Sequence, residues 1–271
     1  MLDLGLTGKR ALVAGAGHRP PRPGFGRVVS LKLAQGGARV ACLDVDEGRA
    51  KATAAEVTEA GGEAVPIVAD LTDRAQVARA VDEAVAALGG IDIAVDIVGG
   101  ARWGSVLDFD DEDWDWTLDH NLRQNFLFLQ AVARQMVAQG SGGSLVSVAS
   151  VDGTASSRLH VAYGAAKAGV ISMAKTFGEE LGPYGIRVNA VAPGGVGSGN
   201  EGEESTLTQE HREPLGPPRT RDIANAIIFF CSELSERVTG QTLLVDGGLM
   251  TMSPFAPPAD LDAVRAFSRG M

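Results

Sequence analysis

Short apolar segments alternate with longer amphipathic segments along the whole chain. The apolar segments are four to eight residues long and rich in Val, Ile, Leu and Ala, which is typical of strands buried on both faces. They are Ala11–Ala14, Ala38–Leu43, Ala64–Ala69, Ile91–Val98, Ser144–Ala149, Ile186–Val191 and Thr242–Val245. This pattern predicts seven strands separated by helices.

The segments between the strands carry apolar residues at helical spacing. In Asp73–Leu88 the apolar stripe consists of Ala75, Val77, Val81, Ala84, Val85 and Leu88. Strands that alternate with helices form a parallel sheet through right-handed crossovers, with helices on both faces. We therefore predict an α/β fold built on one doubly wound, seven-stranded parallel sheet. No change of composition indicates a second domain.

The charge balance excludes some partners. The 271 residues include 24 Lys and Arg against 34 Asp and Glu, a formal net charge of −10. A nucleic-acid or anionic membrane surface needs clustered positive charge, so we expect neither partner. The first residues, MLDLGLTGKR, lack the apolar core of a signal peptide, and no apolar segment approaches the ~20 residues of a membrane span. We expect a cytoplasmic protein.

The cysteines and histidines indicate neither a disulfide framework nor a metal site. Cys42 and Cys231 are far apart in apolar segments, as expected of buried thiols. The four histidines show no metal-ligand spacing, and we expect no metal; they are His18, His120, His160 and His211.

A glycine-rich turn follows the first predicted strand. Gly15 and Gly17 precede an Arg- and Pro-containing segment, and Gly24-Phe25-Gly26 then opens a helix. Glycines at such a turn let backbone N–H groups approach a pyrophosphate at the positive end of the helix. A glycine-rich strand-to-helix turn with no ligand is the alternative that the spacing leaves open.

Acidic residues end the next two strands. Asp44 is placed to accept both hydroxyls of an adenosine ribose, and its carboxylate would repel a ribose 2′-phosphate by roughly 4 kcal/mol at 4 Å. This favours NAD over NADP, although Arg19 and Arg22 offset part of the repulsion if their loop folds over the ribose. Asp70-Leu71 is placed to bracket the adenine ring. Both aspartates also fit plain helix caps, a role that Asp46 equally fits.

The candidate chemistry lies in the second half of the chain. Tyr163 and Lys167 are four residues apart and share one face of a predicted helix, where an ammonium would lower the pKa of a phenol. Ser150 follows the fifth strand, and Asn121 lies on the helix before it. Y-x-x-x-K alone is common as a surface pair, but here it does not stand alone.

With these four residues the sequence resembles the short-chain dehydrogenase/reductase family over residues 6–250. Arg187-Val188-Asn189-Ala190-Val191-Ala192-Pro193-Gly194 and Val245-Asp246-Gly247-Gly248 strengthen the resemblance. It implies that residues 1–250 form an NAD-binding Rossmann domain that carries the catalytic site, with residues 251–271 as a C-terminal tail. Tyr163 would be the general acid/base and Ser150 would orient the substrate oxygen.

The resemblance assigns the other positions too. Lys167 would bind the nicotinamide ribose and lower the Tyr163 pKa, and Asn121 would hold a water in a proton relay. The nicotinamide carboxamide would be held by Pro193, Gly194, Val196 and Ser198. The chain departs from the family pattern where Asp96-Ile97-Val98-Gly99 replaces the usual N-N-A-G. It also departs where Ala14 replaces a Thr, and where Arg19–Pro23 lengthens the glycine-rich turn.

These features predict an oxidoreductase that transfers a hydride between NAD(H) and a secondary alcohol or ketone. A catalytically silent dinucleotide-binding sensor or scaffold is the alternative, and it predicts damage among the four residues. A methyltransferase would not explain Tyr163 with Lys167, and an enoyl reductase would space those two more widely. A sugar epimerase or dehydratase would be longer.

The sequence also gives expectations about the substrate pocket and the oligomeric state. The pocket walls are expected from Gly100–Ser105, which includes Trp103, from Val151–His160 and from an acidic lid, Gly195–Arg212. The acidic lid disfavours anionic carriers and favours a small neutral alcohol or ketone. A homotetramer is implied by the resemblance, through helices near Trp114–Gly140 and Ala162–Pro183. Within the tail, the apolar stripe of Asp260–Phe267 is a candidate for docking on a neighbour. The loop His18–Pro23 either covers the dinucleotide or points outward into solvent, and the sequence leaves both alternatives open.

Overall fold

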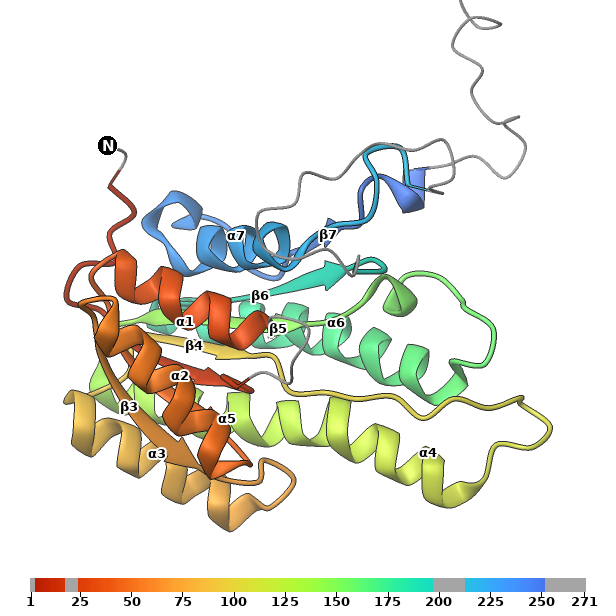
Figure 1. Cartoon of the computed structure of the whole chain (residues 1–271), viewed down its shortest axis with the longest axis horizontal. Helices are drawn as coiled ribbons and strands as arrows, with labels where there is room; N and C mark the ends of the chain where they lie inside the picture. Colours follow the sequence, from red (N-terminus) through yellow and green to blue (C-terminus); the bar gives the residue numbers. More distant parts are fainter. Residues whose placement is uncertain (1–2, 18–23, 197–212, 252–271) are drawn as a thin grey trace, which may run out of the picture.

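The computed structural model describes residues 3–17, 24–196 and 213–251. Its centre is one seven-stranded sheet in the order β3-β2-β1-β4-β5-β6-β7, and every neighbouring pair is parallel (Figure 1). The strands are β1 (Arg10–Ala14), β2 (Arg39–Asp44), β3 (Glu63–Val68), β4 (Ile93–Asp96), β5 (Gly143–Val148), β6 (Ile186–Pro193) and β7 (Thr242–Val245). The expected α/β architecture is confirmed.

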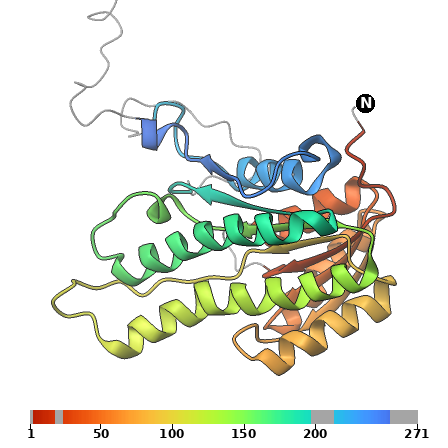
Figure 2. The same ribbon diagram turned by 180° about the vertical axis from the view of Figure 1, so that it is seen from behind.

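Helices cover both faces of the sheet, as Figures 1 and 2 show from opposite sides. They are α1 (Phe25–Gln35), α2 (Glu47–Glu59), α3 (Arg74–Leu88), α4 (Asp111–Leu118), α5 (Gln124–Gln139), α6 (Val161–Leu181) and α7 (Thr220–Cys231). Alternate residues of β1 face opposite sides: Leu12 packs with α3, α5 and α6, whereas Val13 packs with α1, α2 and α7. The sheet therefore separates two apolar cores.

Two local expectations differ from the structure. The fourth strand is shorter than Ile91–Val98, because the Asp96 carboxylate accepts the N–H of Val98 at 3.0 Å and turns the chain out of the sheet. On α3, Ala75 is exposed in the first turn and Ala80 takes a place in the core. The rest of the expected stripe faces the sheet.

The long helix expected near Trp114–Gly140 is interrupted. After α4 the chain makes one π-helical turn, Asp119–Arg123, before α5 continues to Gln139. Single π turns inside α-helices occur frequently at functional sites. This one contains Asn121.

Both cysteines are free and buried, and burial raises the pKa of Cys42 to about 11 and that of Cys231 to about 12. In the described part of the chain no helix is long and apolar enough to cross a membrane. Over the same residues no cluster of His, Cys, Asp and Glu is arranged to hold a metal ion.

Candidate active site

The sheet brings the expected site residues to one edge. Gly15 follows β1, Asp44 ends β2, Ser150 follows β5 and Pro193 ends β6. Because all strands are parallel, these carboxyl ends lie together, and β1 is flanked by β2 and β4 where the strand order reverses. Ligands of open α/β sheets bind in the crevice at such a switch point.

The glycine-rich turn has the backbone that a phosphate cradle needs. Gly15 has φ +74°, and a β-carbon on Gly26 would overlap the carbonyl oxygen of Gly15. Helix α1 starts from Gly24, which offers no side-chain cap, and its first turn has no acidic residue. The N–H groups of a first helical turn have no partner within the helix, and the helix dipole favours an anion there. The turn therefore fits a dinucleotide pyrophosphate.

The Asp44 carboxylate lies next to this turn and is held by two hydrogen bonds and an ion pair. Its Oδ2 accepts the N–H of Gly17 and its Oδ1 accepts the N–H of Asp46, both at 3.0 Å. The Arg49 guanidinium on α2 lies 3.1 Å from Oδ1. Asp44 is buried, and Asp46, not Asp44, caps α2. Arg49 was not among the predicted site residues; its position in the first turn of α2, shortly after Asp44, was the available signal.

At the end of β3, Asp70 accepts hydrogen bonds from the backbone and the hydroxyl of Thr72, at 2.9 and 2.8 Å. Helix α3 is capped by Asp73, whose carboxylate accepts two backbone N–H groups. Asp70 is therefore not the helix cap, and Leu71 beside it is buried.

Asn121 lies in the π turn, and hydrogen bonds to two other residues fix its side chain. Its Nδ2 donates to the carbonyls of Gly100 and Thr117 at 2.6 and 2.8 Å, and its Oδ1 accepts from the N–H of Gly100. A β-carbon on Gly99 would lie 2.7 Å from Asn121 Oδ1 and 3.2 Å from Lys167 Nζ. Asn121 and Lys167 thus converge on the backbone of Gly99, where only glycine leaves room.

Tyr163 and Lys167 lie one turn apart on α6. Lys167 is buried, and its Nζ donates to the carbonyl of Val148 at 2.8 Å and lies 5.6 Å from the centre of the Tyr163 ring. Burial lowers the pKa of Lys167 to about 8, against the opposing charge of Asp96. The ammonium form therefore still predominates at neutral pH.

The pKa of Tyr163 is raised in this structure. Burial is the main cause, the charge of Asp152 adds to it, and hydrogen bonding with Ser150 opposes it. Ser150 is itself buried and begins the short helical turn Val151–Gly153. Ser150 is therefore a neighbour that favours the phenolate.

Asp96 occupies the first position of the altered N-N-A-G segment. It is fully buried, with Asn125 Nδ2 at 2.5 Å from its Oδ2, and burial raises its pKa. Asn125 also donates to the hydroxyl of Ser147 at 2.9 Å. The departure from the family pattern is therefore accommodated by a buried hydrogen-bonded cluster behind Gly99.

The remaining predicted cofactor contacts are at the end of β6 and in the segment that follows it. The N–H of Gly194 donates to the carbonyl of Val245 at 2.9 Å, and a β-carbon on Gly194 would lie 2.9 Å from Asp246 Cα. Val196 is half-buried. Ser198, the loop His18–Pro23, most of the lid and the stripe in Asp260–Phe267 lie outside the described residues.

One feature beside Tyr163 was not identified from the sequence. His160 Nδ1 lies 2.5 Å from Asp152 Oδ2, and the His160 ring contacts both Trp103 and Tyr163. Trp103 and His160 both lie in the segments expected to form the pocket walls, but the pairing of His160 with Asp152 was not predicted.

Comparison with known proteins gives a consistent result. A family profile described as enoyl-(acyl carrier protein) reductase matches residues 22–250. The chain is 36% identical to L-rhamnose 1-dehydrogenase (NAD(P)(+)) of Azotobacter vinelandii, covering 90% of this chain and 97% of that protein. It is also 36% identical to 3-oxoacyl-[acyl-carrier-protein] reductase FabG of Thermotoga maritima, covering 90% and 99%.

A solved structure agrees with the sequence relatives. A short-chain type dehydrogenase/reductase from Mycobacterium marinum superposes with a TM-score of 0.83 at 33% identity, over 92% of this chain and 98% of that one. Sequence and structure thus match over most of the chain, including the segments that carry Ser150, Tyr163 and Lys167. The chain belongs to the short-chain dehydrogenase/reductase family of oxidoreductases.

Proposed function

We propose that the chain transfers a hydride between NAD(H) and the carbinol carbon of a neutral secondary alcohol, with Tyr163 as general acid/base. The observation that carries this proposal is the arrangement of Ser150, Tyr163, Lys167 and Asn121 at the edge of the sheet. A phenol that hydrogen-bonds a buried serine and lies on the same helix face as a buried ammonium is suited to proton transfer.

The dinucleotide would lie across the carboxyl ends of the strands. The turn Gly15–Gly26 and the first turn of α1 would hold its pyrophosphate, Asp44 its adenosine ribose, and Lys167 its nicotinamide ribose. When bound, the nicotinamide supplies the hydride acceptor for oxidation or the donor for reduction.

The side chains would then handle the proton. In oxidation the Tyr163 phenolate takes the hydroxyl proton of the alcohol, and Ser150 donates a hydrogen bond to the same oxygen as its charge develops. Asn121 holds the carbonyl of Gly100 with Nδ2 and would position a water that links Lys167 to solvent. In carbonyl reduction the proton moves the opposite way.

The cofactor preference is proposed from Asp44. Its buried carboxylate lies at the ribose end of the turn and would repel a 2′-phosphate, which favours NAD. Arg49 neutralises part of that charge, so we expect a preference of about tenfold in kcat/KM and not exclusion of NADP.

The test of the proposed function is nicotinamide absorbance with a panel of secondary alcohols and ketones, run with NAD and NADP. Turnover of secondary alcohols that disappears in Tyr163→Phe supports the proposal. Turnover that survives unchanged in Tyr163→Phe would remove Tyr163 from the reaction.

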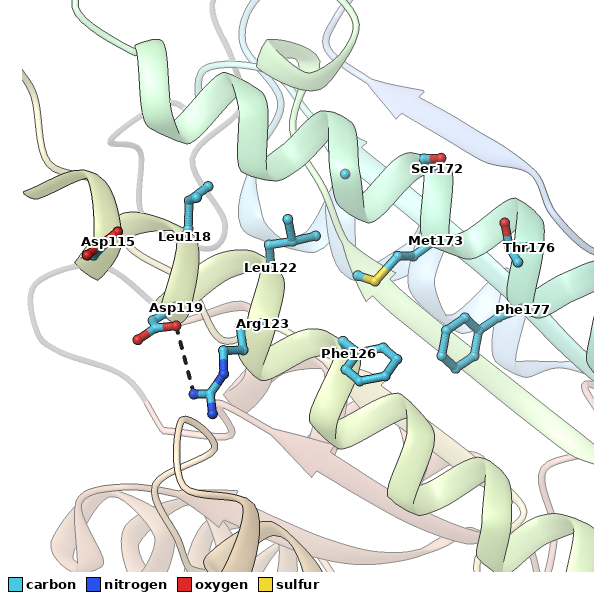
Figure 3. A pocket seen from close by; sticks show the side chains of 11 residues that line it. Asp115, Leu118, Asp119, Leu122, Arg123, Phe126, Ser172, Met173, Thr176 and Phe177 are labelled. Atoms are coloured by element: carbon cyan, nitrogen blue, oxygen red, sulfur yellow. Dashed lines mark ion pairs between the residues drawn. The ribbon is translucent and has the colours of Figure 1, made fainter. Parts of the chain in front are cut away.

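We also propose a homotetramer, because the outer surface of α5 and α6 carries two apolar grooves of about 860 and 680 Å³. Figure 3 shows Leu122, Phe126, Met173 and Phe177 lining the larger one. Both grooves include Phe126 and Phe177, whose rings meet edge to face at 6.3 Å. Apolar side chains that line a surface groove between polar residues are suited to pack against another chain.

Light scattering tests the assembly. We expect four times the chain mass of 28.1 kDa for the wild type, and a smaller species for Phe177→Glu, which places a charge in the groove. A wild-type mass of one chain would refute the homotetramer.

A further inference from the structure

An aspartate–histidine pair lies beside Tyr163 and has no part in the proton transfer proposed above. His160 Nδ1 is 2.5 Å from Asp152 Oδ2, and the Ser157 hydroxyl donates to Asp152 Oδ1. Both carboxylate oxygens are therefore engaged, and the Asp152 side chain is only 10% exposed. An ionised carboxylate only accepts hydrogen bonds, so Nδ1 of His160 donates to it, and in the neutral imidazole Nε2 is then an acceptor.

The backbone holds His160 in place at a cost. Leu159, directly before it, has φ +69° and is the one non-glycine residue with positive φ in the part of the chain that the structure describes. The Leu159 side chain is exposed, but its carbonyl accepts the N–H of Gly104 at 3.2 Å. A left-handed conformation at a non-glycine residue persists only where the surroundings enforce it, and such residues cluster at functional sites.

Three rings form one wall next to the phenol. The Trp103 ring lies 3.9 Å from the His160 ring and 5.9 Å from the Tyr163 ring, and His160 meets Tyr163 edge to face at 6.1 Å. Trp103 is 56% exposed despite these contacts, so much of its indole is open to solvent. In the described residues Nε2 of His160 has no hydrogen-bond partner, and the His160 side chain is 27% exposed.

This wall combines an open apolar surface with an oriented polar atom beside the reacting phenol. Pockets that select polar molecules use a few fixed hydrogen-bonding groups among apolar side chains. A polyol suits this combination, since its CH groups pack on the indole while its hydroxyls keep polar partners. An anionic substituent does not suit it, because Nε2 is an acceptor and Asp152 is negatively charged.

We propose that His160, oriented by Asp152, accepts a hydrogen bond from a hydroxyl on the carbon next to the reacting carbinol, so that the enzyme prefers vicinal diols, polyols or sugars. The proposal rests on the proposed function, since it defines the substrate of the same site. His160 is here a substrate-binding residue, and Asp152 is a positioning residue that acts through it.

The test compares two alcohols that differ by one hydroxyl, butane-2,3-diol and butan-2-ol, each as separate stereoisomers with saturating NAD. We expect wild-type kcat/KM to favour the diol by at least about tenfold, because a site built to bind a hydroxyl rejects the analogue that lacks it. His160→Phe keeps the ring against Trp103 and removes Nε2. It should lose that preference through a higher KM for the diol, with the values for butan-2-ol within about threefold of wild type.

Two further variants make the result specific. His160→Gln retains a polar group and should restore part of the preference. His120→Phe makes the same exchange at a histidine whose ring stacks on Trp116 at 4.1 Å, and it should leave the ratio of the kcat/KM values for the two alcohols unchanged. Calorimetric titration of the Tyr163→Phe enzyme with NAD and the diol gives a readout without turnover, and His160→Phe should weaken that binding.

The outcomes are distinguishable. A wild type that oxidises both alcohols equally overturns the polyol preference and leaves the proposed function standing. Equal losses for both alcohols in His160→Phe give His160 a structural role only and also overturn the proposal. A wild type that oxidises no secondary alcohol or polyol with either cofactor overturns the proposed function, and the substrate proposal fails with it.

Discussion

Asp44 and Asp152 both lie at the carboxyl edge of the sheet, and both are paired with a nitrogenous side chain. Asp44 pairs with Arg49 and accepts two backbone N–H groups, so its carboxylate is fixed in position by its neighbours. Asp152 pairs with His160, whose second nitrogen remains open. The first aspartate therefore sets an electrostatic field, whereas the second sets the orientation of another side chain.

The difference shows how one residue type serves two purposes at one edge. An arginine stays charged at any physiological pH, so the pair at Asp44 changes little unless a ligand brings its own charge. A histidine has two distinct nitrogens, and fixing one of them determines what the other does. The Asp44 region is therefore suited to choosing between NAD and NADP, and the Asp152 region to choosing between substrates.

The largest effect is expected at the substrate end. Tyr163→Phe keeps the packing against Trp103 but removes the phenolic proton, so kcat should fall by 10²- to 10⁴-fold, about the contribution of a general acid/base. Steady-state kinetics and NADH binding measure the two effects separately, and binding should be retained. Tyr184→Phe is the matched control, because Tyr184 is exposed in the short helical turn Gly182–Tyr184 that follows α6, at the opposite end of that helix from Tyr163. Equal kcat values for the two variants would contradict the assignment.

The buried Lys167 should make the free energy of unfolding depend on pH. Its pKa falls from 10.5 when unfolded to about 8 when folded, so between those values the unfolded chain binds a proton that the folded chain does not. Wild-type stability therefore gains from this group as pH rises through that window. Lys167→Met lacks this titrating group. The difference in free energy of unfolding between Lys167→Met and wild type should therefore change in favour of wild type by on the order of 3 kcal/mol from pH 8 to 10.5.

Urea unfolding of both proteins at several pH values measures this difference. Comparison with the variant cancels the opposite trend of Cys42 and Cys231, whose raised pKa values lower stability at high pH. A stability difference that is constant from pH 8 to 10.5 would show that Lys167 is not desolvated in the folded chain.

A smaller effect is expected at Asp44. Asp44→Ala removes the charge that repels a 2′-phosphate, so the NAD preference should fall by at least about tenfold in the ratio of kcat/KM values. Asp73→Asn is the control, since Asp73 is a helix-capping aspartate on α3 whose carboxylate accepts the N–H groups of Ala75 and Gln76. An unchanged ratio in Asp44→Ala would mean that other residues select the cofactor.

The smallest effect is expected at Arg49, and it has the opposite sign. Arg49→Gln leaves the Asp44 charge without its guanidinium partner, so the preference for NAD over NADP should widen by about threefold. The same ratio of kcat/KM values measures it, ideally at low ionic strength because salt screens the pair. A narrower preference would show that Arg49 does not act through Asp44.

Much of the architecture was predictable from the chain alone. Apolar segments of strand length, separated by amphipathic stretches such as Asp73–Leu88, specify buried parallel strands with helices on both faces, because burial on two faces requires residues that are apolar throughout. Tyr163 and Lys167 were identified for a similar reason, since a spacing of four places two side chains on one helix face.

Tertiary structure decided how these residues meet. The raised pKa of Tyr163 depends on burial and on the charge of Asp152, and neither can be read from a local spacing. The position of the Asn121 side chain depends on hydrogen bonds to Gly100, a residue of another segment.

The sequence by itself determined the alternation of strands and helices, the glycine-rich turn and the pairing of Tyr163 with Lys167, because each depends on periodicity or spacing along one segment. The roles of Ser150 and Asn121 were implied by the family resemblance. The tertiary structure alone decided that Arg49 neutralises Asp44 and that Trp103, His160 and Tyr163 form one wall. The physical reason is that charge pairing and ring packing act through space, between segments whose separation in sequence carries no information about their distance.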